Sequence, residues 1–164
     1  MKNGLFLKIF FGICAIALAG DVFAQACTAN LTASAPGTVS GNNCGNNTAL
    51  QNICGNGIGL NLAGVDIYSV ALGASQNFTF SVTTAAFTPQ IAITGSPCSS
   101  NTTCIDNQTI AASGTVTSGT ISGQPAGTYF IFVGDSAADS PGCGAYNMTI
   151  TGTLPVKLQK FSVK

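Results

Sequence analysis

The chain is dominated by short segments in which apolar and polar residues alternate, the pattern of half-buried β-strands. These segments are residues 66–72, 77–82, 91–93, 116–121 and 145–151. Clusters of Gly, Asn, Ser and Pro separate them, and no stretch with a helical period competes with them. The pattern predicts an all-β fold, an antiparallel, jelly-roll-like β-sandwich.

Residues 128–133 form the most strongly β-favouring run, because every one of them is β-branched or aromatic. Tyr129, Ile131 and Val133 share one face of this strand, and Phe130 and Phe132 share the other. A strand that is apolar on both faces is usually central in its sheet and covered on both sides. We therefore predict that this run is a central strand.

The N-terminus has the features of a secretory signal peptide over residues 1–24. It carries two lysines, an apolar stretch over residues 9–19 and a Val-Phe-Ala cleavage site. A lipoprotein cleaved before Cys27 is the alternative, but the preceding Ala-Gln-Ala is a poor lipobox. No later stretch reaches the roughly 20 apolar residues of a membrane-spanning helix. We expect a protein that is secreted or held at the cell surface, without a transmembrane segment.

Charge is almost absent from the body of the chain. Between residues 25 and 154 the charged side chains are Asp66, Asp106, Asp135 and Asp139, and the remaining lysines lie in the last eight residues. This balance argues against nucleic-acid binding. The chain has no His, and no Lys lies in the body to activate a nucleophile, so we expect no enzymatic activity. We interpret Asp66, at a strand entrance, as a turn or cap residue.

Six cysteines remain after the signal peptide, and an even number in an exported chain predicts three disulfides. They are Cys27, Cys44, Cys54, Cys98, Cys104 and Cys143. Of the fifteen possible connectivities, we favour the one that closes two short loops. It pairs Cys98 with Cys104, Cys44 with Cys54, and Cys27 with Cys143.

The expected organisation has four parts: a signal peptide (1–24), an Asn/Gly/Cys-rich loop segment packed on the sandwich (25–59), the β-sandwich core (60–153) and a C-terminal linker or the start of a missing domain (154–164). Residues 25–59 carry little apolar periodicity, so we expect loops there with one short edge strand near Thr38 and Val39.

Several of these strand motifs together resemble the bacterial pre-peptidase C-terminal domain family. The motifs are Asp66-x-Tyr68-x-Val70-x-Leu72-Gly73, Phe78-x-Phe80-x-Val82, Gln90-Ile91-x-Ile93, the Ala126-Gly127-Thr128-Tyr129 strand entrance and Tyr146-x-Met148-x-Ile150. The resemblance covers about residues 38–153. It implies a jelly-roll-like sandwich appended to secreted hydrolases and other surface proteins. The cysteines and the scarcity of acidic residues depart from the family pattern, so the calcium binding of some members does not carry over directly.

Residues 154–164 are similar to the Leu-Pro-Val-x-Leu-x-x-Phe segment that follows extracellular domains in exported proteins of the Bacteroidetes type. In those proteins the segment often precedes a type IX sorting domain. The resemblance implies a fused downstream domain as a partner. A free strand that pairs with a neighbouring molecule is the alternative.

Two further features concern ligands and modification. Asp135 and Asp139, in the loop after the central strand, are the candidate calcium ligands, although this loop lacks the register of a calcium-binding motif; no other cofactor is expected. Six Asn-x-Thr sequences occur, which we interpret as Asn and Thr alternating on exposed strand faces rather than as glycosylation sites. They begin at Asn30, Asn46, Asn77, Asn101, Asn107 and Asn147.

Three functional hypotheses follow. The leading one is a non-catalytic accessory or adhesion module of a secreted or cell-surface bacterial protein, which would contact a polysaccharide or another cell-surface polymer. The second is a carbohydrate-binding module with a planar row of exposed aromatic rings. The row would be drawn from Tyr68, Phe87, Tyr129, Phe130, Phe132 and Tyr146. The third is a self-assembling surface subunit that uses its C-terminal strand.

Overall fold

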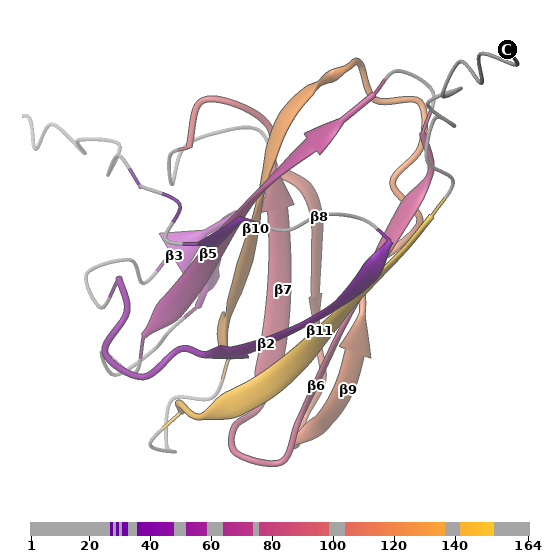
Figure 1. Ribbon diagram of the computed structural model, residues 1–164. Helices are drawn as coiled ribbons and strands as arrows, with labels where there is room; N and C mark the ends of the chain where they lie inside the picture. Colours follow the sequence, from indigo (N-terminus) through magenta and orange to yellow (C-terminus); the bar gives the residue numbers. More distant parts are fainter. Residues whose placement is uncertain are drawn as a thin grey trace, which may run out of the picture.

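The strands of the protein form two facing sheets and one small hairpin in a computed structural model (Figure 1). The structure describes residues 27, 29, 31–32, 36–47, 52–58, 64–73, 76–98, 104–136 and 142–152. Over these residues the secondary structure is all β, which confirms the predicted fold class. No helix in this part of the chain is long and apolar enough to cross a membrane.

The larger sheet has five strands in the order β1-β5-β10-β7-β8. Their bounds are β1 Leu31–Thr32, β5 Val65–Leu72, β10 Gly127–Asp135, β7 Pro89–Thr94 and β8 Cys104–Thr109. The smaller sheet has the order β2-β11-β6-β9, with β2 Gly37–Asn42, β11 Ala145–Gly152, β6 Phe78–Thr84 and β9 Gly114–Thr117. Strands β3 (Asn52–Ile53) and β4 (Asn56–Gly57) pair with each other. All these pairings are antiparallel except the short parallel contact of β1 with β5.

The main core lies between the two sheets and is built by the alternation seen in the sequence. Its largest fully buried members include Phe78 and Phe80 from β6, Ile131 from β10, and Met148 and Ile150 from β11. Because successive side chains of a strand point to opposite faces, the polar residues between these positions are turned outward.

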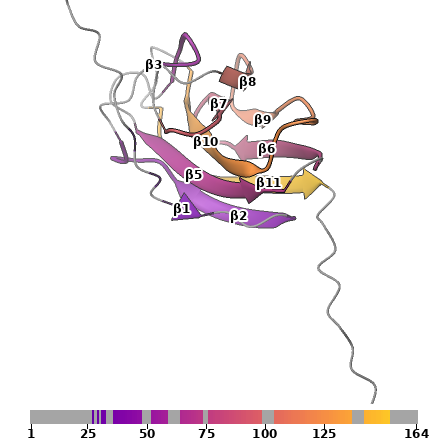
Figure 2. The ribbon, with the colours of Figure 1, turned by 90° about the horizontal axis from the view of Figure 1, so that it is seen from above.

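Strand β10 is the middle strand of the larger sheet, between β5 and β7, as the sequence predicted (Figure 1). Ile131 and Val133 enter the main core, whereas Phe132 enters a second apolar cluster on the other face of the sheet. Ile53 and Ile58 from the N-terminal segment complete this cluster. Figure 2 shows β3 on the side of the molecule away from β2 and β11, where this segment covers the larger sheet.

Three disulfides are present, but the connectivity that we favoured from the sequence is wrong. The bonds join Cys27 to Cys98, Cys44 to Cys143, and Cys54 to Cys104, with Cα atoms 5.3, 4.9 and 5.0 Å apart. Each spans 50 residues or more. The reason is that the fold, not closeness in sequence, brings the cysteines together; Cys44 and Cys143, for example, flank the paired strands β2 and β11.

Strands β2 and β8 lie outside the segments with clear apolar alternation. The edge strand expected near Thr38 and Val39 is present as β2. In contrast, β8 lies between the expected strands at residues 91–93 and 116–121, where the alternating pattern predicts no strand. Its sequence is Cys-Ile-Asp-Asn-Gln-Thr and its residues are exposed or half-buried, so it carries no strong apolar signal.

We expect alanine substitutions on the inner and outer faces of the strands to differ in their effect on the free energy of unfolding. Phe80→Ala or Ile150→Ala should lower the free energy of unfolding by about 2–5 kcal/mol, because each leaves a cavity in the main core. Thr79→Ala and Thr149→Ala, on the outer face of the same strands, should lower it by well under about 1 kcal/mol. Denaturant unfolding measures both sets, and equal losses would contradict the assignment of faces.

Candidate functional site

The outward face of the smaller sheet carries hydroxyl and amide side chains in rows that cross the strands. We call this surface the hydroxyl face. Its first row runs from β2 to β9 through Ser40, Asn147, Thr83 and Thr115. The second row is formed by Thr38, Thr149, Ser81 and Thr117.

Hydrogen bonds between side chains hold both rows in place. In the first row the Ser40 hydroxyl donates to Asn147 Oδ1 at 2.7 Å, and the hydroxyls of Thr83 and Thr115 lie 2.8 Å apart. In the second row the hydroxyls of Thr38 and Thr149 are 3.1 Å apart, and those of Ser81 and Thr117 are 2.9 Å apart. Such cross-strand pairs stabilise a sheet and fix the side-chain rotamers.

The hydroxyl face is uncharged. The four strands that form it contain no Asp, Glu, Lys or Arg. On their inward side, Val39, Met148, Val82 and Val116 stand opposite one another across the same strands. The outer rows are therefore the polar half of the alternation that builds the core.

A shallow groove of about 440 Å³ adjoins the first row. Its polar lining includes Ser40, Thr83 and Asn147, and its small residues include Gly41, Ala85 and Ala145. A volume of this size falls in the range of small-molecule sites, about 300–1,000 Å³. The lining offers neutral donors and acceptors, together with methyl groups.

A buried hydrogen-bond network lies behind this groove and fixes the position of β2. The Tyr146 hydroxyl donates to Asp66 Oδ2 at 2.6 Å, and the hydroxyls of Tyr146 and Tyr68 are 2.8 Å apart. The Asn46 amide donates to Asp66 Oδ1 at 2.7 Å. A side chain at Gly41 would collide with both tyrosines, so only glycine lets β2 pass this close to the network.

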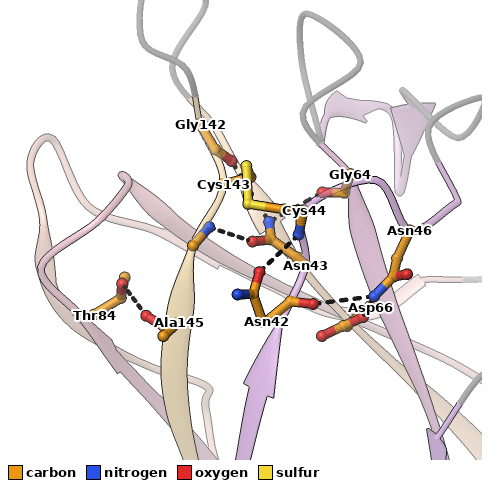
Figure 3. Close-up of a disulfide and its surroundings, with 11 residues drawn as sticks. Asn42, Asn43, Cys44, Asn46, Gly64, Asp66, Thr84, Gly142, Cys143 and Ala145 are labelled. Atoms are coloured by element: carbon orange, nitrogen blue, oxygen red, sulfur yellow. Dashed lines mark hydrogen bonds between the residues drawn. A yellow bond between two sulfur atoms is a disulfide. The ribbon is translucent and has the colours of Figure 1, made fainter.

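The end of β2 is tied to the start of β11 beside this network (Figure 3). The buried Asn43 side chain donates to the carbonyl of Gly64 at 3.1 Å and accepts from the Gly144 amide at 2.9 Å. Next to it, the Cys44–Cys143 disulfide joins the two strands covalently. The wall that separates the groove from the interior is therefore rigid.

We expect stability to fall at alkaline pH because of Tyr146. Burial, followed by the hydrogen bond to Asp66, raises the pKa of Tyr146 far above its ordinary 10.0. Above about pH 10 the unfolded chain loses this proton while the folded protein keeps it, so the free energy of unfolding falls by about 1.4 kcal/mol per pH unit. Tyr146→Phe should flatten this slope in denaturant unfolding between about pH 9 and pH 11. An unchanged slope would show that Tyr146 is not the group responsible.

The acidic residues singled out in the sequence have different environments where the structure describes them. Asp66 is not a turn or cap residue: it lies inside β5, is fully buried and accepts two hydrogen bonds. Asp135 is also buried, at the end of β10, and its Oδ1 accepts from the Thr88 amide at 3.0 Å. Asp139 lies outside the described residues. Among the residues that are described, no group of three or more His, Cys, Asp or Glu is placed to hold a metal ion.

The aromatic residues considered for a sugar-binding row are not available on the surface. Tyr68, Phe87, Tyr129, Phe132 and Tyr146 are each at most 5% exposed, and Phe130 is half-buried. The tyrosines and Phe132 pack into the apolar clusters from their strands, and Phe87, between β6 and β7, packs edge-on against Tyr146. The expectation of an exposed aromatic row is therefore wrong.

The Asn-x-Thr sequences have mixed environments. Asn147 and Thr149 lie on the hydroxyl face, as the alternating pattern predicted, and Asn77 is exposed. Asn46 belongs to the buried network, and Asn107 accepts from Gln90 at 2.8 Å. Asn30 and Asn101 lie outside the described part of the chain.

The hydroxyl face does not stand out as a site in the amino-acid sequence. The alternation of Thr, Ser and Asn was visible in the chain, but the order and register of the four strands create the rows. A count of charged residues per strand does not distinguish it either, since β7 of the larger sheet is also without charge.

Comparison with known proteins supports the fold. The structure is similar to the pre-peptidase C-terminal domain of collagenase from Bacillus anthracis, with a TM-score of 0.50 and 13% identity over 77% of this chain and all of that domain. A periplasmic inhibitor of g-type lysozyme from Aeromonas hydrophila aligns with a TM-score of 0.48 and 12% identity over 71% of this chain and 85% of the inhibitor. No family model and no curated protein matches the sequence. The chain thus has a fold like that of a pre-peptidase C-terminal domain.

Proposed function

We propose that this protein is a non-catalytic accessory or adhesion module of an exported bacterial protein. The observation that carries the proposal is the hydroxyl face, a broad surface of neutral donors and acceptors that spans four strands. Such a surface suits reversible binding to a polymer, and it contains no residue able to act as a general base near neutral pH.

Two further observations support export and an accessory role. Three disulfides are typical of domains that fold in an oxidising compartment outside the cytoplasm. The similar structure from Bacillus anthracis is a domain of a collagenase. An accessory module of this type would bring a fused partner to its target.

A binding panel tests the proposal. Purified protein lacking residues 1–24 is mixed with insoluble cellulose, chitin, xylan, collagen and bacterial cell-wall preparations, and the bound fraction is measured after sedimentation. We expect binding to at least one polymer without release of soluble products. Failure to bind any of them would overturn the binding role, and release of products would overturn the non-catalytic assignment.

Self-assembly is a second candidate, favoured by the free edge of β2. Within the part of the chain that the structure describes, this strand pairs with β11 on one side and with no strand on the other, and its six residues include no charge and no proline. Edge strands without such protection are open to pairing with another strand. The alternating residues 156–163 are the candidate partner.

Deletion of residues 156–164 separates these two roles. Light scattering on the full-length and truncated mature proteins would show an oligomer that disappears on truncation if this segment docks on a neighbour. Two monomers of equal stability would instead support the interpretation of residues 154–164 as a linker.

A further inference from the structure

We infer that the first row of the hydroxyl face, with its groove, binds an extended, neutral, β-linked glycan chain that lies across the strands. The inference rests on the proposed binding function and names the class of polymer and the residues that contact it. It depends on the spacing of the row, its hydrogen-bonding capacity, its lack of charge and its rigidity.

The spacing of the row matches an extended sugar chain. Ser40, Asn147, Thr83 and Thr115 come from four adjacent strands in one register. Adjacent strands lie roughly 4.8 Å apart. One sugar unit of an extended β-linked chain has a similar length, so such a chain would present one unit to each strand.

The row keeps hydrogen-bonding capacity after its internal bonds are made. Ser40 donates its single hydroxyl proton to Asn147, so Asn147 still has both amide protons, and Ser40 can still accept. Thr83 and Thr115 share one hydrogen bond, which leaves one donor and several lone pairs between them. Sugar hydroxyls both donate and accept, and they match this mixture.

The absence of charge selects among polymers. The four strands carry no charged side chain, and Asp66, in the network behind the groove, is fully buried. Anionic polymers therefore gain no ion pair at this surface, whereas a neutral glycan has no charge to desolvate. The methyl groups of Ala85 and Ala145, at the groove, can contact the apolar faces of sugar rings.

The row is held ready for binding. Mutual hydrogen bonds restrain its side chains, and the network of Tyr146, Asp66 and Asn46 fixes the backbone behind the groove. A site that is already ordered loses less conformational entropy when a ligand binds.

The test compares soluble polymers that differ in one property. Affinity electrophoresis would use hydroxyethyl cellulose as the neutral β-linked probe, carboxymethyl cellulose as the anionic probe and soluble starch as the α-linked probe. We expect retardation mainly by hydroxyethyl cellulose. Titration calorimetry with cello-oligosaccharides should show affinity rising with length until one unit faces each of the four strands, and then levelling.

Three variants locate the site. Asn147→Ala and Thr83→Ala should each weaken binding by about three- to tenfold, since each removes at least one hydrogen bond to the sugar. Thr128→Ala, an exposed threonine on the larger sheet, is the matched control and should bind like the wild type. Thermal unfolding of each variant would show that the fold is intact.

Each outcome decides a different point. Equal binding by Asn147→Ala, Thr83→Ala and the wild type would overturn the site while leaving the binding function in place. Equal retardation by soluble starch, or stronger retardation by carboxymethyl cellulose, would overturn the assignment to an extended neutral chain. Binding to collagen or cell walls but to no neutral glycan would also overturn the inference, whereas no binding to any polymer in the panel would overturn the proposed function itself.

Discussion

Chemical reduction is expected to remove most of the stability of the folded protein. The three disulfides span 71, 99 and 50 residues, and closing loops of this length restricts the unfolded chain by about 4 kcal/mol each. The loops overlap, so these contributions do not add fully. Even so, they compare with the whole stability of a small domain, about 5–15 kcal/mol. Thermal unfolding in the presence and absence of reductant measures the difference.

Alkylation and single-pair variants serve as the controls for reduction. The exported protein should show no free thiol under denaturing alkylation, and peptide mapping should recover the Cys44–Cys143 pair. Replacing both Cys54 and Cys104 by serine should lower the melting temperature less than full reduction does. Two or more reactive thiols in the exported protein would contradict the three-disulfide structure.

The disulfide connectivity illustrates what the sequence alone leaves open. Cys44 follows β2 and Cys143 precedes β11, and the pairing of Asn42 with Ala145 continues in register to these two cysteines. Once β2 is known to lie beside β11, the bond follows directly. Apolar alternation identifies strands but contains no information on which strands are neighbours, so the sequence alone favours pairs that close short loops.

The core was more predictable than the edges for a physical reason. β10 and β6 bury nearly every apolar residue, so selection for burial leaves a clear pattern in the sequence. β8 is an edge strand whose residues are exposed or half-buried, and its backbone pairing with β7 holds it in place without apolar alternation. The strands β1, β3 and β4 have two residues each, too few to show any alternation, although Ile53 of β3 is fully buried.

Asp66 shows a different limit of sequence-based reasoning. A lone aspartate at the start of a strand is usually a turn or cap residue, because burial of a carboxylate is unfavourable without partners. In this protein the partners come from distant parts of the chain, Asn46 and Tyr146. Tyr146 reaches Asp66 because Gly41, which has no side chain, leaves space for the tyrosine ring. Three separate segments must be placed before the role of Asp66 becomes visible.

Removal of the Asp66 carboxylate should therefore be among the most damaging single substitutions. Asp66→Ala deletes two hydrogen bonds to a buried charged group, each contributing about 1.5–3 kcal/mol, so we expect a loss of about 3–6 kcal/mol in the free energy of unfolding. Asp66→Asn should lose less, because its amide keeps the shape and can still bond with Tyr146 and Asn46. Denaturant unfolding near neutral pH measures both variants.

A double-mutant cycle with Tyr146 distinguishes a shared network from separate effects. Tyr146→Phe alone should lose about 1.5–3 kcal/mol, because it removes the hydroxyl that donates to Asp66. If the two residues act through that bond, the double variant Asp66→Ala/Tyr146→Phe should lose less free energy of unfolding than the two single variants together. The reason is that Asp66→Ala already leaves the Tyr146 hydroxyl without its acceptor, so removing that hydroxyl costs little more. Additive losses would mean that the 2.6 Å contact between Tyr146 and Asp66 contributes little to stability. In that case the rigidity of the groove wall would depend on Asn46 and the Cys44–Cys143 disulfide rather than on the tyrosines.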